Sequence, residues 1–302
     1  MGTTVTHIEK QRTKKLRQGQ SEQSTPLKQQ DYQFWLTSLV RDLPQVQHKL
    51  NIQRNWQKPL ELYVVDLNAG EGHNKVANCI GSPGTFMITM VRENFLKYRV
   101  RFCDLSQNAL DTLKIYMKKH FSTQHCMQVY QYATDSAVLL RSMNMQAQRN
   151  AKTKRHIAES YYGLVLSDAN NVKDVPYQEL YTLSHLYDNL DISIHWNISA
   201  THRSRGKSVS RDKYPNLSKF VQSSYKAHWY IRGRVGKFIY LHGTNRESVS
   251  GIEDSGFLHI NSPEGDKLFK ELDKSQKEHK FLAANPGCSY DEYLKQKEQE
   301  NV

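Results

Sequence analysis

Residues 60–72 read Leu-Glu-Leu-Tyr-Val-Val-Asp-Leu-Asn-Ala-Gly-Glu-Gly, an apolar run that leads directly into an acidic turn with two glycines. The apolar run has the length and β-branched content of a buried strand. Glycine in the turn lets backbone amides approach a bound group closely, because it has no side chain. At the carboxyl end of a parallel strand, such a turn is typical of sites that hold the phosphate or amino-acid part of a nucleotide-like ligand. The plainer interpretation is a strand followed by an ordinary tight turn.

The spacing of the turn narrows the class of ligand. Residues 66–72 form the pattern D-x-x-A-G-x-G, which lacks the full dinucleotide fingerprint G-x-G-x-x-G, and no P-loop pattern G-x-x-x-x-G-K-[ST] occurs in the chain. The turn therefore favours S-adenosylmethionine over NAD or ATP as the cofactor. The residues expected to bind it here are Asp66, Asn68, Ala69, Gly70 and Gly72.

The expected fold follows from the alternation of strand and helix patterns along the chain. Residues 227–232 and 237–242 flank a turn bordered by glycines and predict a hairpin. The segments together predict an α/β fold with a doubly wound, mostly parallel seven-stranded sheet and an antiparallel edge hairpin. Besides the hairpin, strands are expected at 61–66, 98–103, 127–132, 162–168 and 190–198, and helices at 85–97, 105–120, 136–146 and 175–186.

Composition divides the chain into three parts. Residues 1–30 are rich in Gln, Ser, Thr and Lys and predict a disordered basic arm. Residues 31–275 are expected to form the folded domain, and residues 276–302 a helical or flexible tail. The sequence Ser262-Pro263-Glu264 predicts a capped helix start, and residues 267–281 have an amphipathic helical pattern.

Four acidic residues follow four successive predicted strands: Asp66, Asp104, Asp135 and Asp168. Ligands of a doubly wound sheet lie across the carboxyl ends of its strands, so these carboxylates are candidates for ligand binding. Asp104 is placed to accept both ribose hydroxyls of the cofactor, and Asp135 to accept from the adenine amine. The alternative for any one of them is a helix cap or a turn former.

The formal net charge of +12 is concentrated in residues 1–30 and in residues 201–237. Residues 201–237 hold ten basic side chains against one acidic side chain, interleaved with aromatic residues. This mixture is expected where phosphates are neutralised and bases are stacked, although a solvated basic face is the simpler alternative. The candidate nucleic-acid-binding residues are Arg203, Arg205, Lys207, Arg211 and Lys213.

The remaining features indicate a cytoplasmic protein without a metal site. The chain contains no apolar run near the roughly 18 residues of a membrane span and no signal-peptide pattern. Its four cysteines are scattered without the C-x-x-C spacing of a zinc site.

The chain resembles the class I S-adenosylmethionine-dependent methyltransferases and, within them, the three-Cys-motif partner (TcmP) family of bacterial and mobile-element proteins. The resemblance rests on the turn at residues 66–72, on Gly81-Ser82-Pro83, and on the late helix start at residues 261–265. It covers roughly residues 31–275. It implies a Rossmann-like sheet, S-adenosylmethionine as cofactor, methyl transfer, and a possible protein partner.

The sequence departs from the amine-methylating DNA enzymes after the fourth strand. Those enzymes carry [DNS]-P-P-[YFW], in which polar groups accept the amine hydrogens and the ring stacks on a flipped base. This chain has Ser167-Asp168-Ala169-Asn170-Asn171, with neither prolines nor an aromatic residue. Asp168 and Asn170 remain candidate acceptors, and His202 is a candidate general base because its ordinary pKa lies near neutrality.

The sequence therefore predicts a methyltransferase acting on nucleic acid, with DNA favoured over RNA and a base, such as an adenine amino group, as acceptor. Two alternatives stay open. One is an inactive nucleic-acid-binding partner subunit that retains the methyltransferase fold. The other is a methyltransferase that acts on protein or a small molecule, with the basic segment contacting an acidic partner.

Overall fold

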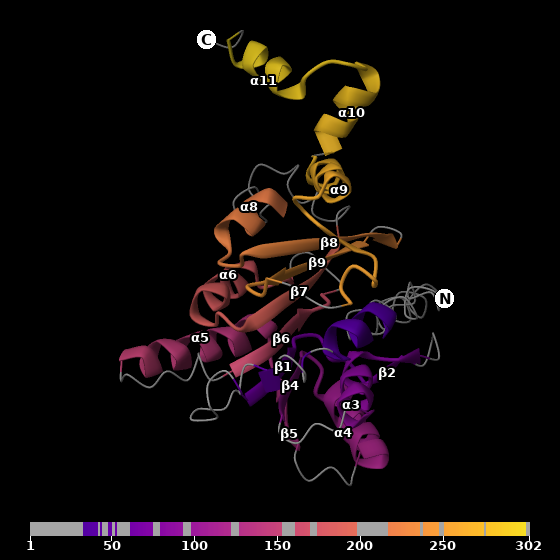
Figure 1. Cartoon of the computed structure of the whole chain (residues 1–302), viewed down its shortest axis with the longest axis vertical. Helices are drawn as coiled ribbons and strands as arrows, with labels where there is room; N and C mark the ends of the chain where they lie inside the picture. The colour runs from indigo at the N-terminus through magenta and orange to yellow at the C-terminus, as the bar shows by residue number, and fades with distance from the viewer. Residues whose placement is uncertain are drawn as a thin grey trace, which may run out of the picture.

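The structure of the protein is a computed structural model that describes residues 33–41, 43, 48–49, 52, 61–74, 79–92, 98–121, 127–152, 161–169, 174–197, 217–235, 238–247, 251–274 and 276–299 (Figure 1). These ranges contain the strands expected from the sequence, apart from residues 198 and 237. No helix among the described residues is long and apolar enough to cross a membrane.

One eight-stranded sheet runs through the centre of the molecule in the order β10-β8-β9-β7-β6-β1-β4-β5 (Figure 1). The strands β5, β4, β1, β6 and β7 are parallel to one another, whereas β9 is antiparallel to both β7 and β8. The predicted fold class is confirmed in its mostly parallel sheet and its antiparallel hairpin. The strands are β1 Glu61–Asp66, β4 Tyr98–Asp104, β5 Met127–Ala133, β6 Tyr161–Ser167, β7 Leu190–Asn197, β8 His228–Val235, β9 Phe238–Thr244 and β10 Phe257–His259.

The expected number of seven strands was wrong by one. The additional strand, β10, pairs antiparallel with β8 at the edge of the sheet. It has only three residues, too few to produce a strand pattern in the sequence, and is placed by the burial of Phe257. A separate two-stranded sheet, β2 (His73–Asn74) with β3 (Cys79–Ile80), follows the turn after β1.

Helices cover both faces of the main sheet because side chains alternate along its strands. Leu62 and Val64 of β1 belong to the core that includes α3, α4 and the helical residues 33–41. Tyr63 and Val65 belong to the opposite core, which includes α5, α6 and α8. These helices are α3 Ser82–Arg92, α4 Gln107–Phe121, α5 Ser136–Lys152, α6 Tyr177–Leu186 and α8 Leu217–Ser223.

Two helix boundaries differ from the expectation. The helix α3 begins at Ser82, because Pro83 is accepted in a first helical turn and does not interrupt it. The helix α9 (Pro263–Asp273) has the predicted Ser262 cap, whose hydroxyl accepts from the Gly265 amide at 3.1 Å, but it ends at Asp273. The helices α10 (Gln276–Ala284) and α11 (Tyr290–Gln299) follow within the predicted tail and lie beyond α9, away from the sheet (Figure 1).

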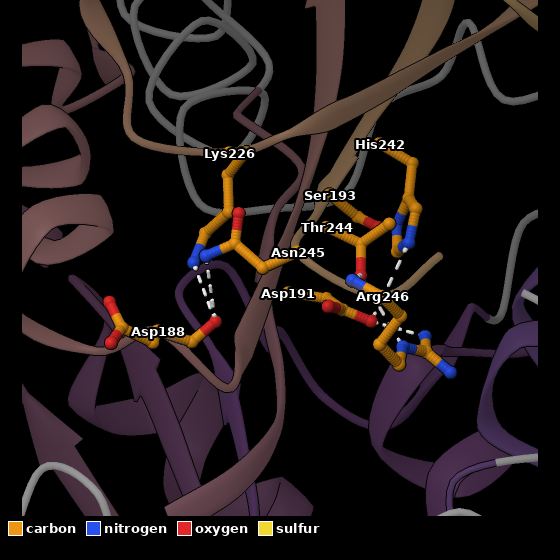
Figure 2. Close-up of polar contacts among 8 residues, drawn as sticks. All are labelled: Asp188, Asp191, Ser193, Lys226, His242, Thr244, Asn245 and Arg246. Carbon is orange, nitrogen blue, oxygen red and sulfur yellow. Dashed lines mark hydrogen bonds and ion pairs between the residues drawn. The ribbon is translucent and has the colours of Figure 1, made fainter. Parts of the chain in front are cut away.

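A buried polar cluster joins the antiparallel hairpin to the amino ends of the parallel strands (Figure 2). Asp191 of β7 forms an ion pair with Arg246 and lies 3.6 Å from His242 Nε2, and the Ser193 hydroxyl lies 2.7 Å from His242 Nδ1. Burial lowers the pKa of His242 to about 4, so the imidazole is neutral near neutral pH. The cluster pairs charged and polar side chains inside the fold and lies at the amino end of β7, opposite the turn after β1.

Lys226 anchors the start of the hairpin in the same region (Figure 2). Its buried ammonium donates to the carbonyl oxygens of Tyr187 at 3.0 Å and Asp188 at 3.2 Å. Burial lowers the pKa of Lys226 to about 8. Asn245 donates to the same Asp188 carbonyl at 3.1 Å, so two side chains hold the turn that precedes β7.

Candidate functional site

The candidate site lies at the carboxyl ends of β1, β4 and β6. From β1 the chain passes first to β4 and β5 on one side of the sheet, and then returns to β6 and β7 on the other side. In an open parallel sheet, the loops diverge where the strand order reverses, and this leaves a crevice above the strand ends in which ligands bind. The reversal falls between β1 and β6, so the turn after β1 lies at its centre.

Hydrogen bonds to the two neighbouring strand ends hold this turn in place. The Asn68 side-chain oxygen accepts from the backbone amide of Asp168, just after β6, at 3.0 Å. On the other side, the Gly70 amide donates to Asp104 Oδ2 at 3.0 Å, and the Ala69 amide donates to the Cys103 carbonyl at 2.9 Å. The turn is therefore fixed to both adjacent strands before any ligand binds.

The two glycines of the turn serve different purposes. Both have positive φ angles, +59° at Gly70 and +77° at Gly72, which L side chains rarely adopt. A Cβ atom on Gly72 would lie 2.6 Å from Leu113 Cδ1, so this glycine permits close packing on α4. A Cβ atom on Gly70 would have no neighbour within 4 Å. The position beside the Gly70 Cα is therefore clear of described protein atoms, whereas the position beside Gly72 is filled by Leu113.

Asp66 is fully buried at the end of β1. Desolvation raises the pKa of its carboxyl to about 7, an effect that the nearby Asp168 and Asp104 carboxylates reinforce. Hydrogen bonding from the Ser82 side chain and from the Asn68 amide, at 3.1 Å from Oδ1, lowers the pKa. Oδ2 nevertheless receives no hydrogen bond of ordinary geometry from the described residues.

Asp104 lies at the end of β4 with both carboxylate oxygens turned toward backbone amides. Oδ1 accepts from the Ser106 amide at 2.8 Å and Oδ2 from the Gly70 amide at 3.0 Å. Partial burial raises the pKa of Asp104, while these hydrogen bonds oppose the rise. Each carboxylate oxygen has a second lone pair, so both remain able to accept from a ligand hydroxyl.

Asp135 follows β5, at the same edge of the sheet but two strands away from β1. Its exposed side chain accepts from the Ala137 amide at 2.7 Å, which makes it the N-cap of α5. Asp135 is therefore a helix cap in the structure, which is the alternative that the sequence left open for it.

Asp168 follows β6 and contacts a histidine that was not among the expected site residues. Its Oδ1 pairs with Nδ1 of His195 near the end of β7. The Asp168 side chain is 29% exposed, whereas that of His195 is 1% exposed. The pair therefore has one partner at the surface of the site and one inside the core.

The alternation of polar and apolar residues along β7 could have indicated from the sequence that His195 has a buried polar partner. The strand reads Leu-Asp-Ile-Ser-Ile-His-Trp-Asn, in which polar residues alternate with apolar ones. The apolar set faces α5, α6 and α8, and Asp191, Ser193 and His195 are all buried on the other face. Buried polar side chains need partners, so this alternation indicates polar contacts on that face.

Several expected site residues lie outside the described residues. They are Asn170 and His202, proposed for the acceptor side, and the basic residues Arg203, Arg205, Lys207, Arg211 and Lys213. The segment that contains most of them begins after Asn197, at the carboxyl end of β7, on the same edge of the sheet as the site.

Cys103 is a buried thiol at this edge. Its thiol is buried beside the turn and donates to the Thr134 carbonyl, with a sulfur-to-oxygen distance of 3.3 Å. Burial raises the pKa of Cys103 to about 12, and the neighbouring Asp104 and Asp66 carboxylates act in the same direction. The reactive form of a cysteine is the thiolate, which this site suppresses near neutral pH.

No protein-family model matches the sequence, and no curated protein matches it. Among solved structures, the chain is similar to protein LPL1258 from Legionella pneumophila at 11% identity and a TM-score of 0.45, covering 73% of this chain and 86% of that one. An S-adenosylmethionine-dependent methyltransferase from Agrobacterium tumefaciens is 10% identical with a TM-score of 0.39, covering 71% of this chain and 61% of that one.

Magnesium protoporphyrin IX methyltransferase from Synechocystis is 12% identical with a TM-score of 0.34, covering 69% of this chain and 80% of that one. These similarities are too distant to carry an argument about this chain. They do not support the narrower resemblance to the TcmP family. The fold class given above follows from strand order and strand direction alone.

Proposed function

We propose that this protein is an S-adenosylmethionine-dependent methyltransferase that acts on nucleic acid. The observation that carries the proposal is the turn after β1, held at the reversal of strand order between the Asp104 carboxylate and the Asp168 backbone. A nucleoside ligand fits such a place, because the crevice above the strand ends accepts it and the acidic strand ends bind its hydroxyls.

The chemistry of the turn matches the parts of S-adenosylmethionine. Asp66 Oδ2 is a buried oxygen without an ordinary hydrogen bond from the described residues, and it offers an acceptor to the ammonium of the amino-acid part. The open space at Gly70 admits that part close to the backbone. Asp104 is placed to accept from the ribose hydroxyls. When bound, the cofactor supplies an electrophilic methyl group, and the acidic surroundings suit its positive charge.

Nucleic acid is proposed as the acceptor because of where the basic residues occur. The segment with ten basic side chains, residues 201–237, follows β7 in the chain, although Lys226 within it is buried and donates to backbone carbonyls. Phosphate contacts supply most of the affinity of nucleic-acid binding and position the substrate. DNA is favoured over RNA, and a base amine is the favoured acceptor.

A second candidate is a nucleic-acid-binding subunit that has lost turnover. The observation that favours it is Asp168-Ala169-Asn170, which lacks the prolines and the stacking ring of the amine-methylating enzymes. Such a protein would retain the sheet and the basic segment without transferring methyl groups.

Incubation with methyl-tritiated S-adenosylmethionine and separate pools of DNA, RNA and protein tests the proposal. We expect label in the DNA pool, and loss of that label when Asp104 is replaced with Ala. Label only in protein would contradict the choice of acceptor. Salt-sensitive binding to DNA without label in any pool would favour the inactive subunit.

A further inference from the structure

His195 lies outside the cofactor turn but at the same edge of the sheet. It is the sixth residue of the eight-residue strand β7, and its ring contacts the Asp168 carboxylate through Nδ1. Only 1% of the His195 side chain is exposed, whereas its partner Asp168 is 29% exposed, so Asp168 is the member of the pair that lies at the surface. Any role in the reaction must therefore pass through Asp168.

Core packing fixes the plane of the imidazole. The His195 ring stacks on Tyr240 of β9 with a centroid distance of 4.9 Å and an interplanar angle of 19°. Tyr240 in turn packs against Trp35, with centroids 4.6 Å apart. A ring held in this way presents its Nδ1 atom to Asp168 in one orientation.

Asp168 is held at its backbone as well as at its side chain. Its amide donates to Asn68 Oδ1 at 3.0 Å, so the residue is tied to the cofactor turn. Its carboxylate pairs with His195 through Oδ1 and keeps 29% of its surface exposed. The two attachments hold Asp168 at this edge of the sheet while part of its side chain stays exposed.

We propose that His195 is the positioning residue for Asp168, and that Asp168 receives the proton of the methyl acceptor. The inference rests on the proposed methyltransferase function. The acceptor nitrogen forms a bond to the methyl carbon while the carbon–sulfur bond breaks, and the electron pair of that bond stays on sulfur. The acceptor then gives its N–H proton to Asp168, which releases it to solvent. The His195 Nδ1–H donor holds Oδ1 so that Oδ2 faces the acceptor.

The surroundings determine the expected pH dependence. The described groups near the pair include the Asp66 carboxyl, the Asn68 amide oxygen and the Tyr240 ring. A hydrogen bond to a carboxylate favours its charged form, so removal of the His195 donor makes Asp168 harder to ionise. The acidic limb of the pH–rate profile should then move to higher pH.

Two substitutions of His195 separate positioning from packing. His195→Phe keeps a ring over Tyr240 and removes the donor, whereas His195→Asn keeps an N–H close to the Nδ1 position and removes the ring. The control is His185→Phe, which alters an exposed histidine that also packs on an aromatic residue, Tyr225, with centroids 5.5 Å apart. Each full-length variant is compared in S-adenosylmethionine affinity, thermal stability and the pH profile of kcat, with the pool that the wild type labels as substrate.

For His195→Phe we expect kcat to fall by roughly tenfold to a hundredfold and its acidic limb to move up by about one pH unit, at unchanged cofactor affinity. His195→Asn should recover most of the rate and the wild-type limb, and His185→Phe should match the wild type. A His195→Phe variant with the wild-type kcat and pH profile would overturn the positioning role while leaving the methyltransferase proposal intact. Absence of label in every pool with the wild type would remove the methyltransferase proposal and the role of His195 with it.

The contact has a readout that does not need turnover. In ¹⁵N NMR spectra of the wild type, the His195 ring should be the Nδ1–H tautomer, and Asp168→Ala should change its ring shifts. Identical ring shifts in the two proteins would overturn the pairing on which the inference depends.

Discussion

We expect Asp66 to make the binding of S-adenosylmethionine depend on pH. Its pKa is raised to about 7 by burial, so the free protein holds a proton there at lower pH. A cationic ligand favours the ionised carboxylate, so binding should release that proton and should tighten as pH rises toward 7. Titration calorimetry at pH 6.5 in buffers of different ionisation enthalpy measures this release. Asp66→Asn should abolish it, and equal proton release by the variant and the wild type would exclude Asp66 from the binding site.

Asp104 should matter both to the turn and to the ligand. Asp104→Ala removes the acceptor of the Gly70 and Ser106 amides, at 3.0 and 2.8 Å, and leaves the proposed ribose hydroxyls without a partner. We expect S-adenosylmethionine affinity to fall by roughly 1–3 kcal/mol. The control is Asp111→Ala on the exposed face of α4, which should not change the affinity. An affinity equal to that of the wild type would mean that the ribose is bound elsewhere.

At the scale of single residues, the sequence identified the acidic strand ends but not the role of each. Asp135 and Asp104 have the same kind of position in the sequence, yet one caps α5 and the other holds the Gly70 amide. The difference depends on which backbone amides face each carboxylate in three dimensions. His195 was missed for the same reason, because its partner Asp168 is distant in the chain and near only in the folded sheet.

Lys226, just before the hairpin β8–β9, donates to two carbonyls in the fold, but burial makes its ammonium easier to deprotonate than in an unfolded chain. The pKa of Lys226 is about 8 in the folded protein and 10.5 in an unfolded chain, so the unfolded state binds more protons between these values. The free energy of unfolding should therefore rise with pH from about 8 to 10.5 through this group. Urea unfolding of the wild type and of Lys226→Met across this range measures the effect.

In Lys226→Met the rise due to this group should be absent. The variant should also be less stable near neutral pH by roughly 1–3 kcal/mol, because two carbonyls lose their donor. Parallel stability curves for the two proteins above pH 8 would contradict the buried, weakly basic state of Lys226.

At the scale of elements, apolar periodicity predicted the strands that lie inside the sheet. Strands such as β6, in which six of seven residues are buried, show a continuous apolar run. Strand β10 has only three residues and no such run, so its position depends on pairing with β8 and could not be predicted from the sequence. The start of α3 was also misplaced, because it was expected at residue 85, whereas Ser82 and Pro83 lie in the first turn of this helix.

The net positive charge of the whole molecule leads us to expect that its binding of nucleic acid weakens as the salt concentration rises. Each neutralised phosphate releases condensed counterions, so log K should fall with log salt at about −0.7 to −0.9 per contact. Replacement of Arg203 and Arg205 with Ala should weaken DNA binding and flatten the slope by about two contacts, with unchanged cofactor affinity. The control, Lys118 and Lys119 replaced with Ala, removes the same charge from the end of α4. The basic segment would be contradicted as the binding surface if only the Lys118 and Lys119 control had a flatter salt dependence. Absence of salt-dependent binding by the wild type would contradict it as well.

Titration calorimetry with S-adenosylmethionine tests most directly whether the turn after β1 binds this cofactor. The wild type should bind it saturably and in preference to NAD and ATP. Gly70→Val should abolish binding, because a branched side chain fills the open space at the turn and is strained at a φ of +59°. Gly287→Val is the matched control: its φ of +86° imposes similar strain, with equally open surroundings, between α10 and α11. Binding lost in Gly70→Val and kept in Gly287→Val, with both variants folded, is the predicted result; no binding by the wild type, or wild-type affinity in folded Gly70→Val, would contradict the assignment.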